Sequence, residues 1–203
     1  MSKALEQARE LVKILEEMEA KEGNESKALL SSLHPGDTFK IGEHDFIVLE
    51  QSNGQTKVIS KGLMAEEKNF DEDTNDYGKS SIKDFIESEI QPIVEKEVGA
   101  ENLIEHEVDL TSVDMQEEFE PCRCKVRLIT FDEAREYNGI LVNDDFDDWW
   151  WTCTPWSTPK RGWSYSVAVV SPSGNFNGDF CFSRYGVRPV CILKSNIFVS
   201  KGE

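Results

Sequence analysis

Four aspartates gather in the segment NDDFDDWWW, which spans residues 143–151. Clustered carboxylates are the ligands that a hard cation such as Ca²⁺ prefers. The segment lacks the alternating acids, central glycine and distal glutamate of an EF-hand loop. We therefore interpret it as a solvated acidic loop and not as a metal site. The only candidates for a calcium site, and weak ones, are Asp144, Asp145, Asp147 and Asp148.

Cysteine and histidine are the other residue types that could carry metal or acid–base chemistry. Cys122 and Cys124 are one residue apart, but no second pair and no neighbouring histidine completes a four-ligand zinc site. His34, His44 and His106 lie in predicted turns and loops without a recognisable partner. No nucleophile elbow, phosphate-binding loop or dinucleotide fingerprint occurs. We expect no cofactor and favour a non-enzymatic protein, although an active site of scattered carboxylates stays open.

The C-terminal quarter of the chain combines aromatic side chains with serine, asparagine and glycine. Antibody paratopes have this composition, because rigid aromatic rings supply contact area and small polar groups adapt to the ligand. Alternation along the predicted strands 164–171 and 179–183 turns about half of the aromatic side chains toward the core. The others, with loops 156–163 and 174–178, form a predicted ligand-binding surface, and an ordinary sheet with decorated loops is the alternative. The candidate residues are Trp156, Trp163, Tyr165, Asn175, Phe176, Asn177, Phe180, Phe182 and Tyr185.

Some residues in the same region have the character of core residues. Trp150 and Trp151 are adjacent on a predicted strand, so that one can fill the core while the other shields a loop. Arg188, followed by Pro189, is expected to make a buried ion pair or to bond to loop carbonyls. We assign these four residues a structural role.

The predicted elements alternate short strands with few helices. A helix over residues 80–97 is capped by Ser80 or Ser81 and interrupted by Pro92, and a second over 131–137 is capped by Thr130. Residues 65–79 read as an acidic loop and 99–121 as irregular. This pattern predicts an α+β fold with a mainly antiparallel sheet. The predicted strands cover residues 38–41, 45–51, 56–63, 124–130, 164–171, 179–183 and 186–193.

The N-terminal residues 1–24 form a separate predicted unit, ahead of a domain at 33–198. Residues 2–22 are rich in strong helix formers. Their apolar residues recur at steps of four and three, the seam of a short coiled coil. Either this seam joins copies of the chain through residues 4–18, or it packs on the protein's own body. The seam consists of Ala4, Ala8, Leu11, Leu15 and Met18.

Charge and hydropathy narrow the function classes. The net charge of −17 repels phosphate backbones, so nucleic acid is not an expected partner. From Trp151 onward, however, the chain has six basic residues and only two acidic ones. No apolar run approaches the length of a membrane span, and the polar N-terminus lacks a secretory signal, so we expect a cytoplasmic protein without a membrane partner. Five cysteines, an odd number, are then expected to be reduced thiols.

Six short motifs follow one another in the chain, at Gly36–Gly42, Lys79–Ile86, Val126–Ala134, Trp150–Pro155, Val170–Gly174 and Gly186–Val190. With these motifs in this order, residues Leu33 to Leu193 resemble a bacterial and phage domain family of unknown function. At Trp150–Pro155 this chain has Thr152-Cys153 where the family pattern has Leu-Arg, so any role of that arginine is absent.

That family is similar to the C-type-lectin-like fold of formylglycine-generating-enzyme relatives and of the variable proteins of diversity-generating retroelements. The resemblance implies a rigid scaffold whose C-terminal surface binds a protein or a glycan, in a phage or mobile-element setting and in the cytoplasm or on a virion. The residue types at 164–166 and 175–185 are compatible with diversification of asparagine codons, as in several such proteins.

Two alternatives follow from the same observations. An oxidoreductase like the formylglycine-generating enzymes would need Cys181 and Cys191 to hold copper as two close thiolates, whereas these cysteines have the character of small core residues. A structural or assembly protein would use the N-terminal helix to form oligomers.

Overall fold

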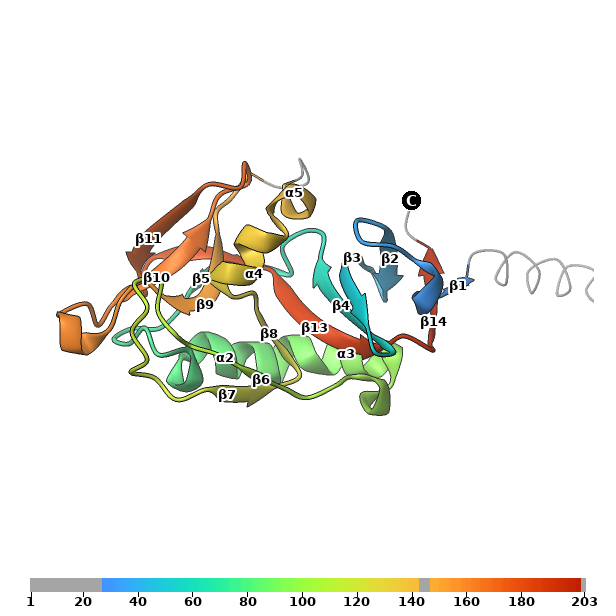
Figure 1. Cartoon of the computed structure of the whole chain (residues 1–203), viewed down its shortest axis with the longest axis horizontal. Coiled ribbons are helices and arrows are strands. Elements are labelled where there is room, and N and C mark those ends of the chain that lie inside the picture. The colour runs from blue at the N-terminus through green and yellow to red at the C-terminus, as the bar shows by residue number, and fades with distance from the viewer. Residues whose placement is uncertain (1–26, 143–146, 202–203) are drawn as a thin grey trace, which may run out of the picture.

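The computed structural model describes residues 27–142 and 147–201. The predicted helix at 1–24, and with it the possible oligomerisation seam, lies outside the described residues. Figure 1 shows two large sheets side by side, with one long helix running along both. Within the described residues, no helix is both long enough and apolar enough to cross a membrane.

The larger sheet has seven strands, all paired antiparallel. The turn at Ser52–Gln55 joins two of them, as predicted, with Asn53 and Gly54 at positive φ of 51° and 73°. At one end the first and last strands of the described chain pair with each other. In spatial order the strands are β1 (Lys27–Leu29), β14 (Phe198–Lys201), β2 (Thr38–Ile41), β3 (His44–Ser52), β4 (Gln55–Ser60), β13 (Pro189–Lys194) and β8 (Val126–Leu128).

The second sheet carries most of the predicted binding surface and lies at the far end of the molecule from β1 and β14 (Figure 1). Its pairs are antiparallel except for a parallel contact between Gly186 and Trp150. Its strands, in spatial order, are β11 (Phe176–Phe180), β10 (Ser166–Val170), β9 (Trp150–Pro155), β12 (Arg184–Val187) and β5 (Ala65–Asn69). A third sheet pairs β6 (His106–Val108) with β7 (Cys122–Cys124). The predicted α+β class with mainly antiparallel strands is confirmed.

Several strand predictions were wrong in detail. The segment 99–121, expected to be irregular, contains β6, and the strand expected at 186–193 is divided between β12 of the second sheet and β13 of the larger sheet. The segment 65–79 was expected to be a loop, but its first five residues form β5, whose acidic and polar side chains suit an edge strand. The strand expected at 179–183 is β11, which begins and ends three residues earlier. The chain therefore turns at Cys181–Ser183, where the alternation of a strand no longer applies.

The long helix runs from Ser81 to Val98 and is not interrupted by Pro92. It consists of α2 (Ser81–Phe85), a π turn η3 (Ile86–Ile90) and α3 (Gln91–Val98). The π turn shifts the hydrogen-bond register by one residue just before the proline. Pro92 lies in the first turn of α3, directly after this shift, so the helix continues past a residue that has no N–H to donate. The cap predicted at Ser80 is confirmed, since its hydroxyl accepts from Lys83 N.

Shorter helical segments complete the fold. The helix predicted after Thr130 is confirmed as α4 (Phe131–Glu136), with a capping box between Thr130 and Glu133. The remaining helical turns are α5 (Asn138–Leu141) and the 3₁₀ turns η1 (Leu30–Ser32), η2 (Tyr77–Lys79), η4 (Ala100–Asn102) and η5 (Pro159–Arg161).

The hydrophobic core consists of two clusters of side chains, with Trp150 in one and Trp151 in the other. Trp150 and Trp151 are both buried and point to opposite faces of β9, each into its own cluster of apolar side chains. Trp151 meets the edges of Phe70 and Tyr185 at centroid distances of 5.6 and 4.9 Å. Trp150 lies under the guanidinium of Arg188, 5.1 Å from the ring centroid. Neither tryptophan shields a loop; both anchor β9 between two packed layers.

A buried polar network fixes α4 against the larger sheet. The Arg127 guanidinium forms two hydrogen bonds with the Glu133 carboxylate, at 2.6 and 2.7 Å. Lys57 Nζ lies 2.9 Å from the same carboxylate. Arg127 Nε donates to His106 Nε2 at 2.7 Å, which requires that nitrogen to be unprotonated. We call these four residues the Arg127 network. It positions Phe131, at the start of α4, beside the second sheet.

His106 makes this network sensitive to acid. Burial and the charge of Arg127 lower the pKa of His106 to about 4. The unfolded chain, with a histidine pKa of about 6.5, therefore binds more protons than the folded one between these values, and stability falls as the pH falls through this window. We expect a loss of about 1–2 kcal/mol between pH 7 and pH 5, measured by urea unfolding.

The His106→Gln variant tests this origin, because a glutamine oxygen can accept the Arg127 bond without titrating. Its unfolding free energy should change less than that of the wild type between pH 7 and pH 5. His34→Gln, at an exposed position, is the control and should keep the wild-type slope. Equal slopes for wild type and His106→Gln would contradict the assignment.

Candidate functional site

Four large aromatic side chains are exposed at one end of the second sheet. Trp163 is 54% exposed, Tyr165 47%, Phe180 51% and Phe182 55%. Single exposed aromatic residues are ordinary, but four on neighbouring backbone segments form a patch of the kind found at interaction sites. We call these four residues the aromatic patch.

The turn after β11 brings the patch together. Phe180 and Phe182 stack with ring centroids 5.1 Å apart and an angle of 6° between the ring planes. Between them, Cys181 turns into the core, and its N–H donates to Tyr165 O at 2.6 Å. Burying Cys181 thus turns its two phenylalanine neighbours outward and holds them beside Tyr165.

Several polar groups next to the patch form hydrogen bonds within the protein. Asp179 Oδ1 accepts from Phe180 N at 2.6 Å and from Ser183 Oγ at 3.2 Å, and Asp179 Oδ2 accepts from the Tyr185 hydroxyl. Burial and this hydrogen bond raise the pKa of Tyr185 to about 12. Asn177 Oδ1 accepts from Gly178 N at 2.9 Å. What the patch presents outward is therefore mainly apolar ring surface.

Three of the predicted binding residues are only partly exposed. Tyr185 packs against Trp151 in the core. Trp156 and Phe176 lie against Phe131 of α4, with centroid distances of 6.5 and 4.9 Å. Trp156 also lies so close to Gly178 that a Cβ there would be 2.5 Å from the indole ring. Trp156 and Phe176 thus support the sheet from its α4 side, whereas Tyr185 belongs to the core cluster of Trp151, and all three are separate from the aromatic patch.

The two asparagines are exposed, but at different points of β11 and the turn before it. Asn175 closes that turn, where its N–H donates to Ser171 Oγ at 2.9 Å. Asn177 bonds to its own strand, as described above. The nine predicted binding residues are thus divided between an exposed patch, a supporting layer and a polar turn.

A single buried asparagine, Asn75, positions the loop that carries Trp163, and no sequence pattern singled it out. Asn75 is fully buried, and its Nδ2 lies 2.8 Å from Ser157 O, 2.9 Å from Trp163 O and 3.0 Å from Ser166 O. Its N–H donates to Ser164 O at 3.0 Å. Asn75 therefore fixes both ends of the 157–163 loop to the segment after β5.

The segment predicted to be irregular, 99–121, supplies the other support of the 157–163 loop. Asp114 accepts hydrogen bonds from Ser112 Oγ at 2.6 Å and from Ser157 Oγ at 2.7 Å, and both lower the pKa of its carboxyl. Glu118 accepts from Lys160 N at 3.1 Å. No periodic pattern marks this segment, so its role could not be predicted from sequence.

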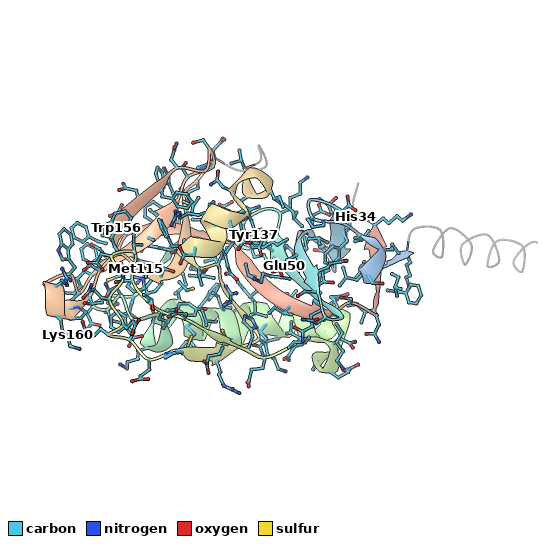
Figure 2. All side chains as sticks on the ribbon, in the orientation of Figure 1. His34, Glu50, Met115, Tyr137, Trp156 and Lys160 are labelled. Carbon is cyan, nitrogen blue, oxygen red and sulfur yellow. The ribbon has the colours of Figure 1, made fainter. Side chains whose placement is uncertain are left out.

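The tip of the 157–163 loop is basic. Lys160 and Arg161 are exposed in η5, three and two residues before Trp163. Figure 2 shows Lys160 at the end of the molecule opposite His34, on the same side as Trp156. In a protein with a net charge of −17, the aromatic patch is therefore bordered by a local positive charge.

Residues 53–195, more than half of the chain, match the family described as "Domain of unknown function (DUF6273)". The chain belongs to this family. No curated protein and no solved structure matches the chain. The DUF6273 match begins in the β3–β4 turn and ends just after β13, so it includes the aromatic patch and all strands of the second sheet. The resemblance found from the sequence motifs began earlier, at Leu33.

The predicted metal ligands do not form a site in the part of this DUF6273 chain that the structure describes. No group of three or more histidine, cysteine, aspartate or glutamate residues there has the arrangement to hold a metal ion. Asp144 and Asp145 lie outside that part. Asp147 is exposed, and Asp148 Oδ1 accepts from the N–H of Trp149 at 2.8 Å.

The two cysteines of the copper alternative are buried in different places. Cys181 lies in the turn after β11, and Cys191 lies in β13 of the larger sheet. Burial raises the pKa of Cys181 to about 11 and that of Cys191 to about 12. Both are therefore thiols at neutral pH, whereas a reactive or metal-binding cysteine is a thiolate.

Proposed function

We propose that this protein is a non-enzymatic recognition protein that binds a protein partner through the aromatic patch. The main evidence for this proposal is that four exposed aromatic side chains cluster on a rigid support. Tryptophan and tyrosine are enriched among residues that dominate binding energy, because they bury large areas at low entropic cost. Asn75 and Asp114 hold the 157–163 loop in place before a partner arrives, which lowers the cost of binding.

A protein partner fits this surface better than a glycan. Glycan recognition relies on polar side chains that exchange hydrogen bonds with sugar hydroxyls beside a stacking ring. Here the Asp179 carboxylate and the side-chain oxygen of Asn177 accept internal hydrogen bonds, and the large exposed side chains are aromatic and bordered by Lys160 and Arg161. This chemistry suits a partner with an apolar contact area flanked by acidic residues.

The family resemblance supports two finer proposals. It implies that the α+β architecture is of the C-type-lectin-like type, in which a fixed scaffold displays a variable C-terminal surface. It also favours a phage or mobile-element setting. The position of the aromatic patch, at the end of β11 and in the segments that adjoin β10 and β11, agrees with such a display surface.

Removing the patch tests the proposal. Trp163→Ser and Phe182→Ser should each weaken partner binding by about 100-fold while changing the thermal unfolding midpoint little, because both side chains are more than half exposed. The measurement is affinity capture from host extract followed by a titration with the captured protein. Phe198→Ser, 73% exposed at the other end of the molecule, is the matched control and should bind as the wild type does.

Three results would overturn this function. If all three variants capture the same protein equally well, the aromatic patch is not the binding surface. If Trp163→Ser and Phe182→Ser unfold, the two rings are structural. If only a glycan array gives binding that the two variants lose, the partner class is wrong.

A further inference from the structure

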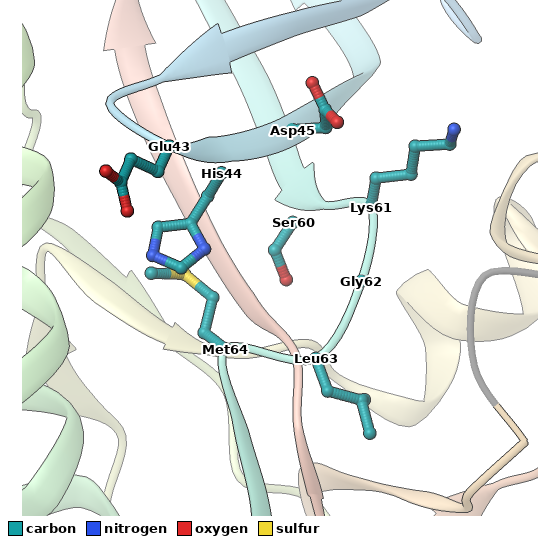
Figure 3. Close-up of a pocket in the computed structure, with 8 residues that line it drawn as sticks. All are labelled: Glu43, His44, Asp45, Ser60, Lys61, Gly62, Leu63 and Met64. Atoms are coloured by element: carbon teal, nitrogen blue, oxygen red, sulfur yellow. The ribbon is translucent and has the colours of Figure 1, made fainter.

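A cavity of about 290 Å³ lies away from the aromatic patch, beside the end of β4 (Figure 3). One wall is the β2–β3 turn with the start of β3, residues 43–45. The other wall is residues 60–64, which lead from β4 to β5. Its volume is at the small end of the range of ligand sites in proteins, so it suits a small molecule.

Ser60 is the polar group at the base of this cavity. The residue is 1% exposed, and its Oγ has no hydrogen-bond partner among the described residues. A buried hydroxyl without a hydrogen-bond partner is energetically unfavourable. Figure 3 shows the hydroxyl directed into the space between His44 and the 62–64 segment. A polar atom of a small molecule in this space could pair with it.

The wall at 60–64 is held by the segment Gly186-Val187-Arg188, which lies in one of the family motifs. Arg188 Nε donates to Ser60 O at 2.8 Å, and Met64 N donates to Val187 O at 2.9 Å. Leu63 packs so tightly on Gly186 that a Cβ there would be 2.5 Å from Leu63 Cδ1. The motif therefore fixes the backbone that carries Ser60.

The two walls are also joined to each other. Lys61 N donates to Asp45 O at 2.7 Å, which sets the distance between the β2–β3 turn and the end of β4. His44 and Met64, both half-buried, line the cavity on the same side of Ser60 in the view of Figure 3. The cavity is thus formed by backbone contacts and does not depend on a loop closing over it.

The charges around the cavity favour a cationic ligand. Glu43 is exposed at the rim, and Asp45 has Lys40 at 3.7 Å. The Lys61 ammonium points away from Ser60 (Figure 3). With an overall charge of −17 in addition, an anionic ligand would meet repulsion here, whereas an ammonium group could approach the Glu43 carboxylate.

We infer that this cavity binds a small hydroxylated amine, with a ligand hydroxyl paired to Ser60 Oγ and the ammonium group paired to Glu43. Ser60 supplies one donor and two acceptor positions, and the His44 ring supplies a further polar edge. Met64 supplies apolar surface for the carbon skeleton. This site is independent of the proposed protein-binding function.

Three sugars of equal ring size and different charge test the inference. Glucosamine, glucose and glucuronate are titrated into the full-length protein at pH 6.5 and followed by calorimetry and by chemical-shift changes. We expect glucosamine to bind at least about 10-fold more tightly than glucose, the equivalent of one charge-assisted hydrogen bond. Glucuronate should not bind. Equal binding of all three sugars, or none by glucosamine, would overturn the inference.

Variants locate the binding. Ser60→Ala should weaken glucosamine binding about 10-fold without lowering the unfolding midpoint, because its hydroxyl has no partner to lose. Glu43→Gln should remove the preference for glucosamine over glucose. Glu136→Gln, an exposed acid on α4, is the control for Glu43 and should bind as the wild type does, as should Trp163→Ser. Unchanged glucosamine binding in Ser60→Ala and Glu43→Gln would show that the amine binds elsewhere.

Discussion

Replacement of Glu133 by alanine is expected to lower the free energy of unfolding by about 3–5 kcal/mol, the cost of removing one partner of a buried ion pair. The Arg127 side chain is only 4% exposed and would keep its charge without the carboxylate that it binds through two hydrogen bonds. Lys57 would lose the same partner. The capping box of α4 would also be lost, so the segment that carries Phe131 should loosen first.

Denaturant unfolding at pH 7 measures this effect as a shift in midpoint. Asp132→Ala is the matched control: this acid is next to Glu133 on α4 but 85% exposed, and its ion pair with Arg135 spans 3.5 Å. Exposed pairs contribute little, so the control should lose less than about 1 kcal/mol. Equal losses in Glu133→Ala and Asp132→Ala would show that the Arg127 network does not hold α4.

The ion pair between Arg127 and Glu133 also makes the stability of the protein depend on pH, in a lower pH range than His106 does. Burial alone would raise the pKa of Glu133, but Arg127 and Lys57 outweigh it and hold this pKa well below its usual range. A carboxylate whose pKa is lowered by folding stabilises the protein above its unfolded pKa, about 4.5, and loses that effect as the pH falls further. Wild-type stability should therefore decline again below about pH 4.5, and this second decline should be smaller in Glu133→Ala, where Asp71 and Asp114, whose pKa values folding also lowers, keep the rest of it.

The features that were predictable from sequence are those whose signals are local. The capping residues Ser80 and Thr130 lie within three residues of the N–H groups that they bond to. The hairpin turn at Ser52–Gln55 joins strands that pair directly. Such signals depend only on neighbouring residues, so no knowledge of the tertiary structure is needed to read them.

Features that depend on tertiary contacts could not be predicted from such local signals. β5 is an acidic segment that becomes a strand because β12 offers it an edge, and its own composition disfavours a strand. The helix passes Pro92 because a π turn changes its register, which no pattern of apolar residues indicates. Alternation also fails for β10, whose five residues are all buried because the second sheet is covered on both faces.

The predicted binding surface, too, was predictable only in part from the sequence. Composition pointed to the aromatic residues of the last fifty residues, but it could not separate Trp163 and Phe182, which are exposed, from Phe176, which packs on Phe131. That separation depends on where β11 ends and on where α4 packs. No sequence pattern indicated the role of Asn75, because its hydrogen-bond partners lie 82 to 91 residues away in the sequence.

Asn75→Asp is expected to release the 157–163 loop and to lower the free energy of unfolding by about 2–4 kcal/mol, as for a buried polar group that loses its partners. The amide nitrogen that lies within 3.0 Å of three carbonyl oxygens would become a carboxyl oxygen, which cannot donate when ionised. Trp163 would then lose its fixed position, and partner binding by the aromatic patch should fall although no patch residue has changed.

Limited trypsin digestion measures the release directly, because exposed Lys160 and Arg161 lie at the tip of this loop. In native conditions, cleavage there should be at least about 10-fold faster in Asn75→Asp than in the wild type, since local opening sets the rate. Asn102→Asp is the matched control: Asn102 Nδ2 makes a single bond, to Val98 O at 2.7 Å, at the far end of the long helix. If both variants are cleaved at the loop at the wild-type rate, Asn75 does not hold it. If cleavage accelerates while partner binding stays unchanged, the fixed position of Trp163 is not what prepares the aromatic patch for its partner.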